Sequence, residues 1–263
     1  MNRTSRSLFL REMVVWRRDW LSFLIRTLIQ PALFLLVFGV LIPSLTSGFS
    51  GGRAGVEDQM LLVMGPGLVA NAAFAQSMLC AAMPLMMELS YTREIESRTG
   101  LPVGPMTLAS VKVTAAAVQG FVAAACVDLL FAVFAWEFSV DLPLGWIGVI
   151  PIWIASFPVC LCGSACGLLL GSIINAKSLG SVFSALMLPI SMLGCVYFPW
   201  SLISGRSLWR IVVLFNPQTY ASEFVRHWFR FGDGLDPGFC FMVIFLLGIL
   251  LGLLGFRSFK ARL

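Results

Sequence analysis

The sequence contains one pattern that could present a nucleophile. Residues 48–52, GFSGG, match G-x-S-x-G, in which a sharp turn between a strand and a helix exposes the serine. The single histidine, His227, is the candidate base for Ser50. Because residues 48–52 lie in a short glycine-rich stretch between two apolar runs, a flexible turn is the favoured interpretation. A membrane-embedded hydrolase that uses Ser50 is the enzyme alternative.

The other patterns for nucleotides or metals lack their usual surroundings. The chain has no G-x-x-x-x-G-K-[ST] pattern, so we expect it not to bind ATP through a P-loop itself. Residues 65–70, GPGLVA, fit a loose dinucleotide pattern but lie inside an apolar run with no strand before them. Cys160, Cys162 and Cys166 have no histidine or carboxylate nearby, which favours small helix-packing residues. We therefore expect no catalytic residue, no metal and no cofactor in this chain.

The composition places these residues in an integral membrane protein. Hydrophobic residues make up 59% of the 263 residues and charged residues only 12%, against about 25% charged in soluble domains. Apolar runs of 18 or more residues recur, and each is long enough to cross a bilayer as a helix. The runs are continuous and not alternating, which excludes a barrel. We predict an all-α protein with one transmembrane domain over residues 1–263.

Six transmembrane helices are expected, with a surface helix before the first. Phe9, Met13 and Trp16 recur at helical spacing within residues 7–20, which predicts an amphipathic helix in the membrane surface, within a segment 1–26. A simple basic flank of the first span is the alternative. Glycines four apart in the fourth and sixth spans indicate close helix packing. The expected spans cover about residues 27–46, 61–87, 113–136, 146–172, 181–200 and 239–256.

The distribution of positive charge predicts the orientation. With the N-terminus inside, thirteen of the eighteen lysines and arginines fall in inside segments, as the positive-inside rule requires. Both termini are then cytoplasmic in a multi-pass protein of the cell inner membrane. Because the basic residues lie at span ends and not on one solvated face, we expect no nucleic-acid partner. We expect these charges to contact the membrane lipids.

One carboxylate, Asp128, lies deep in an expected span. Ionisable groups at that depth usually face the bundle interior or a water-filled path. A hydrogen bond to a neighbouring helix, or a protonated acid, is one interpretation. A place on the substrate path is the other.

The polar segment 88–112 is expected on the cytoplasmic side. Residues 88–99 can form a short charged helix that Gly100 ends, and Pro102 and Pro105 prevent its continuation. Such a helix suits docking onto a soluble partner. An ordinary loop is the alternative.

The segment 198–237 is expected on the outer side as short helices. Its start is too apolar for an exposed loop, so we expect it to dip back into the membrane, with helices broken at Pro199 and Pro217. Its aromatics form either an interfacial belt or an aromatic gate or stacking surface for sugar rings. The aromatics in question are Tyr197, Trp200, Trp209, Tyr220 and Trp228.

The order of these features resembles the membrane subunits of type-2 ATP-binding-cassette exporters over nearly the whole chain. The resemblance begins with the surface helix before the first span. Its other motifs are Gln30-Pro31 leading to Phe38-Gly39, Arg93-Glu94 through Gly100 to Pro105, and Phe198-Pro199 followed by Asn216-Pro217-x-x-Tyr220. The stretch 102–105, PVGP, departs from the more apolar family pattern.

The resemblance implies two functional segments. In that family the loop between the second and third spans holds a coupling helix that docks on the ATPase. It implies this role for Arg93, Glu94, Glu96, Arg98, Gly100 and Pro105. Short outer helices before the last span close the exit in that family. It implies this role for Tyr197, Phe198, Pro199, Trp200, Asn216, Pro217 and Tyr220.

The resemblance also implies the assembly. Two copies of the chain are expected to pair and to bind two P-loop ATPase subunits, which would carry the ATP and Mg. An amphiphilic, lipid-like or glycan-linked substrate would then move outward between the copies. Efflux of a hydrophobic drug is the alternative within the family, and a passive membrane anchor is a further one.

The orientation is testable by cysteine labelling. In a cysteine-free variant, Ser50→Cys and Ser204→Cys should react with an impermeant thiol reagent added to intact cells, because both positions are expected outside. Ser97→Cys and Ser258→Cys should react only after the cells are permeabilised. Labelling at position 97 in intact cells would overturn the orientation.

Overall fold

A computed structural model of the chain describes residues 3–42, 44–45, 56–89, 104–137, 149–174, 178–203, 208–229 and 234–262. These residues form helices and turns, and no strand occurs among them. Five helices are long and apolar enough to cross a membrane, which confirms the all-helical membrane architecture. They span Trp20–Leu41, Leu62–Met87, Pro105–Glu137, Pro151–Ile173 and Pro237–Arg262.

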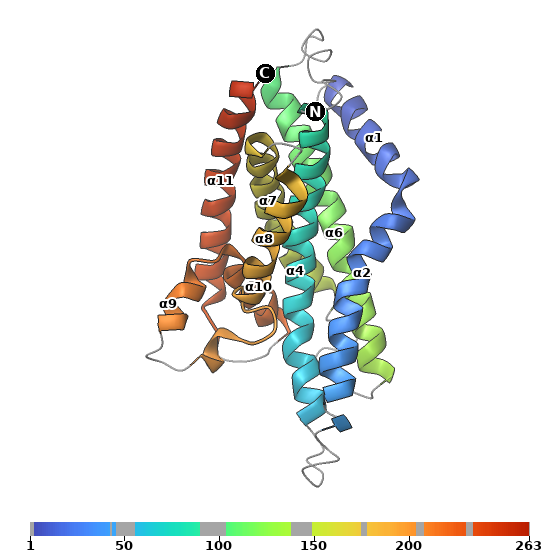
Figure 1. The fold of residues 1–263 in the computed structure, drawn as a ribbon, viewed down its shortest axis with the longest axis vertical. Helices are drawn as coiled ribbons and strands as arrows, with labels where there is room; N and C mark the ends of the chain where they lie inside the picture. The colour runs from blue at the N-terminus through green and yellow to red at the C-terminus, as the bar shows by residue number, and fades with distance from the viewer. Residues whose placement is uncertain are drawn as a thin grey trace.

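The N-terminal part of the chain forms an elbow. Helix α1 (Arg3–Arg18) and helix α2 (Trp20–Leu36) meet at Asp19, whose backbone leaves the helical conformation (φ −106°, ψ 21°). In Figure 1 the elbow bows away from the bundle before α2 returns to it. A π-helical turn, η1 (Val37–Leu41), extends α2. The surface helix therefore begins earlier than predicted, and the first span begins at Trp20 and not near residue 27.

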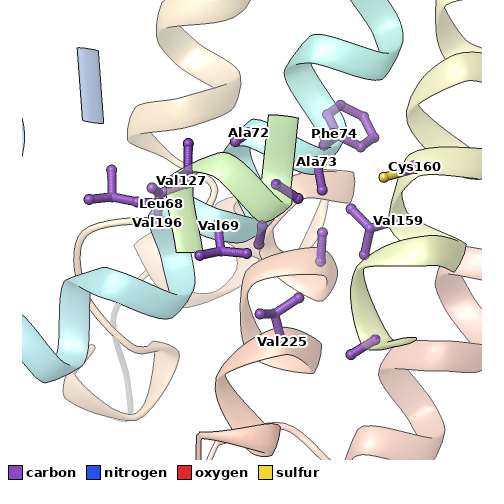
Figure 2. Packing of buried hydrophobic residues seen from close by; sticks show 14 of the residues in the cluster. Leu68, Val69, Ala72, Ala73, Phe74, Val127, Val159, Cys160, Val196 and Val225 are labelled. Carbon is purple, nitrogen blue, oxygen red and sulfur yellow. The ribbon is translucent and has the colours of Figure 1, made fainter. Parts of the chain in front are cut away.

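The bundle is built around α4 (Val56–Met87), which packs against α6 (Pro105–Glu137) and α7 (Val149–Ile173). Small residues bring α4 and α7 together: a Cβ on Gly163 or Gly167 would collide with the α4 backbone. This confirms the packing role predicted for the glycines of the fourth span. Helix α11 (Pro237–Arg262) covers the other side of α7. Figure 2 shows the core, with labelled side chains that include Leu68, Val69, Ala72, Ala73, Phe74, Val127, Val159, Cys160, Val196 and Val225.

The glycine pair of residues 65–70 has a packing role. Gly65 lies against the ring of Phe131, and Gly67 lies against the backbone carbonyl of Val196. Only a residue without a Cβ lets the α4 backbone approach so closely. The glycines that resemble a dinucleotide pattern are therefore explained by the close packing of α4 against its neighbours.

The fifth expected span, about 181–200, is wrong beyond Met192. Helix α8 (Leu179–Met192) has 14 residues, so it is about 21 Å long and shorter than the hydrocarbon core of about 30 Å. Turns follow it, and Cys195 has a positive φ of 51°, which a helix cannot contain. The apolar composition of the stretch continued past this turn, and composition alone does not show where a helix ends.

The two ends of the bundle hold different parts of the chain. At one end, Arg262 Nη2 near the end of α11 donates a hydrogen bond to the carbonyl of Ile173 at the end of α7 (2.8 Å). Figure 1 places the start of α1 at this same end and the helices α9 and α10 towards the other. Both termini therefore lie at one end, which we call the terminal end. That this end is cytoplasmic stays a prediction.

The close approach at Gly67 is testable by adding one methyl group. Gly67→Ala should lower stability by about 1–3 kcal/mol, because the methyl group meets backbone and not a movable side chain. Gly252→Ala is the matched control, since its methyl group would lie 3.8 Å from Ala165 Cβ and gains the same helix propensity. Equal apparent melting temperatures of the two variants in detergent would contradict the packing at Gly67.

Candidate functional site

The segment 198–237 contains helix α10 (Pro217–Trp228), which begins where Asn216 caps it. The side chain of Asn216 accepts a hydrogen bond from the backbone N–H of Gln218 (3.0 Å), and its amide donates to the carbonyl of Ile190 in α8 (2.7 Å). Pro217 occupies the first helical position, where its missing N–H is harmless. Pro217 therefore starts a helix and does not break one. Pro199 likewise precedes the short 3-10 helix η5 (Trp200–Leu202).

One face of α10 satisfies the carbonyls that the neighbouring helices leave open. Thr219 Oγ1 donates to the carbonyl of Val213 (2.7 Å), near the end of helix α9 (Leu208–Leu214). Tyr220 donates its hydroxyl to Leu214 (2.8 Å) in the same helix. Ser222 Oγ donates to the carbonyl of Gly194 (2.6 Å), just beyond α8. The Asn-Pro-x-x-Tyr pattern is thus a capping device that fastens α8, α9 and α10 together. We call these three helices and the turn after α8 the outer block, after the side on which the sequence predicts them.

A buried ion pair fastens the turn after α8 to α10. The side chains of Glu223 and Arg226 form an ion pair, and they are only 1% and 2% exposed. Arg226 Nη2 also donates to the carbonyl of Cys195 (2.8 Å), and Glu223 Oε1 accepts from the backbone N–H of Trp200 (3.0 Å). Burial lowers the pKa of Arg226, while the Glu223 carboxylate opposes that shift and favours the charged form.

The structure divides the predicted aromatic set in two. The ring of Tyr197 stacks on Phe34 of α2, with ring centroids 4.5 Å apart. The guanidinium of Arg210 lies 3.6 Å from the ring centroid of Trp200. By contrast, Trp209 and Trp228 are exposed, as residues of an interfacial belt would be. Phe198 is half-buried and Pro199 is buried, and Tyr220 packs edge-on to Phe239, so these residues belong to the packed group.

A second charge cluster lies at the terminal end of the bundle. Lys112 of α6 is buried, and its ammonium contacts Glu88 Oε1 just beyond α4 (2.8 Å) and Glu12 Oε1 of α1 (3.5 Å). Sequence reasoning treated Lys112 and Glu88 only as loop charges. Lys112 lies far from both acids in the sequence and shares no helix with either, so no sequence pattern predicts these contacts.

Asp128 lies between α6 and α7. Its side chain is buried, and its Oδ2 accepts a hydrogen bond from Trp153 Nε1 of α7 (3.1 Å). The ring of Trp153 also packs edge-on to Phe121. This geometry fits the interpretation of an interhelical hydrogen bond, and a role on the substrate path stays a prediction.

The sequence of these helices matches a known protein family over most of the chain. The family described as ABC-2 type transporter matches residues 5–230, which run from α1 to the end of α10. The chain belongs to the ABC-2 type transporter family. A comparison with curated proteins finds no match.

Membership makes this chain a transport subunit, a permease domain with several membrane-spanning helices and no ATPase domain in this chain. Of the residues expected to couple this ABC-2 domain to its ATPase, Pro105 is described and begins α6. Arg93, Glu94, Glu96, Arg98 and Gly100 lie outside the described residues, so their coupling role stays a prediction.

The residues that suggested other chemistry have different surroundings in this ABC-2 domain. Ser50 lies outside the described residues, and His227 packs edge-on to Trp228 in α10. Cys160 and Cys162 are buried within α7. Within the described ranges, no group of three or more His, Cys, Asp or Glu side chains could hold a metal ion.

The buried pair of the outer block is testable by removing one partner at a time. Arg226→Met should lower stability by about 3–5 kcal/mol, because it leaves the Glu223 carboxylate buried without its cation. Glu223→Gln should lower stability in the same way, because it leaves the Arg226 guanidinium buried without its anion. The double variant should be more stable than the sum of the single losses predicts. Additive losses in thermal unfolding, or a loss no larger than that of Arg210→Met, would contradict the pair.

Proposed function

We propose that this chain is the permease subunit of an exporter that moves an amphiphilic, lipid-like or glycan-linked substrate outward. A separate P-loop ATPase subunit, which carries ATP and Mg, drives it. The observation that carries the proposal is the ABC-2 match over residues 5–230, which covers the surface helix, the loop and the outer block in one domain. The terminal end faces the ATPase on the cytoplasmic side of the cell inner membrane.

The packing of the bundle favours a path between two copies of the chain. Helix α4 packs closely against α6 and α7. Ala70, Ala73 and Met78 of α4 are fully buried, and Gly120 of α6 lies against Ser77 of α4. A bulky amphiphile would have to separate these helices. By contrast, α2 presents large apolar side chains outward. A second copy is the partner we propose to complete the path.

The contacts of the outer block support a role for it at one end of the proposed path. Tyr197 and Trp200 sit on a turn that the buried pair of Glu223 and Arg226 holds in place. The stack of Tyr197 on Phe34 connects this turn to α2, the first span. A movement of α2 would therefore reach the aromatic side chains directly. We propose that this block closes the outer end of the path.

The exporter proposal can be tested through the loop between α4 and α6, which is expected to dock on the ATPase. With an affinity-tagged chain, a P-loop ATPase subunit should copurify from native membranes. Glu94→Ala combined with Arg98→Ala should reduce that copurification and the stimulated ATP hydrolysis by about tenfold, if each side chain contributes one charged contact. The chain itself should stay folded in the membrane, because the helix packing described above involves neither residue.

A matched control removes the same two charges elsewhere. Glu137→Ala combined with Arg206→Ala takes away one acid and one arginine from segments expected at the opposite end. It should leave copurification unchanged. Equal ATPase association for both double variants would exclude the proposed docking loop, and no ATPase with the unaltered chain would exclude the exporter.

A further inference from the structure

The cluster around Lys112 joins three elements that are separate in sequence. Lys112 lies in α6, Glu88 directly follows α4, and Glu12 lies in α1. Residues 89–111, which include the whole proposed docking loop, run between Glu88 and Lys112. A movement of the ends of α4 and α6 would therefore change the position of the ammonium that α1 contacts.

A cavity of about 750 Å³ lies where the elbow of α1 and α2 stands away from α4. Helix α1 contributes Arg11 and Trp16 to its lining, and α2 contributes Arg26. The opposite wall includes Met83 and Cys80 of α4. Polar groups on the elbow and apolar groups on α4 make a space that suits an amphiphile. In Figure 1, α1 lies at the edge of the bundle, where the elbow stands away from the other helices.

The cluster lies at the edge of this cavity. Glu12 and Glu88 are themselves among its lining residues. Around the cluster, Leu8 of α1 packs beside Leu108 and Phe259, so apolar packing and an ionic contact both help to hold α1 to the bundle at the terminal end. Releasing the ionic contact would weaken this attachment.

The two ion pairs of Lys112 differ in strength. The contact with Glu88 is 2.8 Å long, and that carboxylate side chain is 14% exposed. The contact with Glu12 is 3.5 Å long, and Glu12 is 21% exposed. A longer and more hydrated ion pair contributes less. Because one ammonium faces two carboxylates, strengthening one contact weakens the other.

We propose that the contact between Glu12 and Lys112 is a latch that holds α1 over the cavity and that the ends of α4 and α6 control. Movement that carries the pair of Lys112 and Glu88 away from α1 breaks the longer contact with Glu12 first. Helix α1 then swings out about Asp19 and opens the cavity to the polar end of an amphiphile in the adjacent leaflet. The role of the latch in transport rests on the proposed exporter function. The ion pair and the movement of α1 involve only this chain and can be tested without an ATPase.

A native cysteine reports on the cavity. Cys80 lines it and is half-buried, so its reaction rate with a maleimide should follow the position of α1. The test uses the full chain in nanodiscs without ATPase, with the other six cysteines replaced. Glu12→Gln should raise the Cys80 rate about twofold to fivefold, since it removes an ion pair of partial exposure. Glu12→Asp, which shortens the side chain, should give a smaller increase.

The opposite change at Glu88 separates a latch from general loosening. Glu88→Gln leaves Glu12 as the charged partner of Lys112 in this cluster, so the latch should tighten and the Cys80 rate should fall. A merely structural role predicts faster labelling in both variants. Glu137→Gln, which removes a carboxylate at the far end of α6, should change nothing, and a chain that keeps only Cys126 should report no difference.

Two outcomes overturn the latch: equal rates in all variants, or an increase for both Glu12→Gln and Glu88→Gln. The control over it is tested in the complex with the ATPase, where ATP should change the Cys80 rate of the unaltered chain but not that of Glu12→Gln. A latch that works in nanodiscs but ignores ATP would contradict its control by the loop. Failure to find an ATPase would contradict the exporter and leave the nanodisc result standing.

Discussion

The structure depends on one constraint: buried backbone carbonyls need hydrogen-bond donors, and the last carbonyls of helix α8 have none within the helix. The side chains of α10 supply them. Asn216, Thr219, Ser222 and Arg226 donate to carbonyls in the last turns of α8 and α9 or in the turn that follows α8. Gly67 then lets α4 press on the turn that these bonds hold in place. An apolar chain therefore contains one strongly polar helix, towards the end of the bundle opposite the termini.

Hydrophobic composition was enough to predict the long spans, because each needs only an uninterrupted apolar run. It failed at α8, where the apolar run continues through a turn at Cys195. Asn216-Pro217 did carry a local signal that could have been read as a cap followed by a first helical residue. Arg226 illustrates what counting charges misses: its position between the last two expected spans predicts a hydrated outer charge, yet it is among the most buried side chains.

The same limit applies to the other end. Lys112 and Glu88 are separated by a loop of polar residues, and no periodicity relates them to Glu12 in α1. Their contacts arise only when α4 and α6 pack side by side and α1 folds back across them. Charge clusters that join distant elements follow from the tertiary fold, whereas caps and spans follow from local sequence.

The two ends of the domain are held by charges of different exposure. The pair of Glu223 and Arg226 is almost completely buried and has further backbone partners on both sides, so opening it would expose a charge to a nonpolar surrounding. The pair of Glu12 and Lys112 is longer and partly hydrated, so its loss is compensated by water. A conformational change should therefore begin where separation is least unfavourable, at α1. The outer block would then move as a rigid unit, through the contact of Tyr197 with Phe34 of α2.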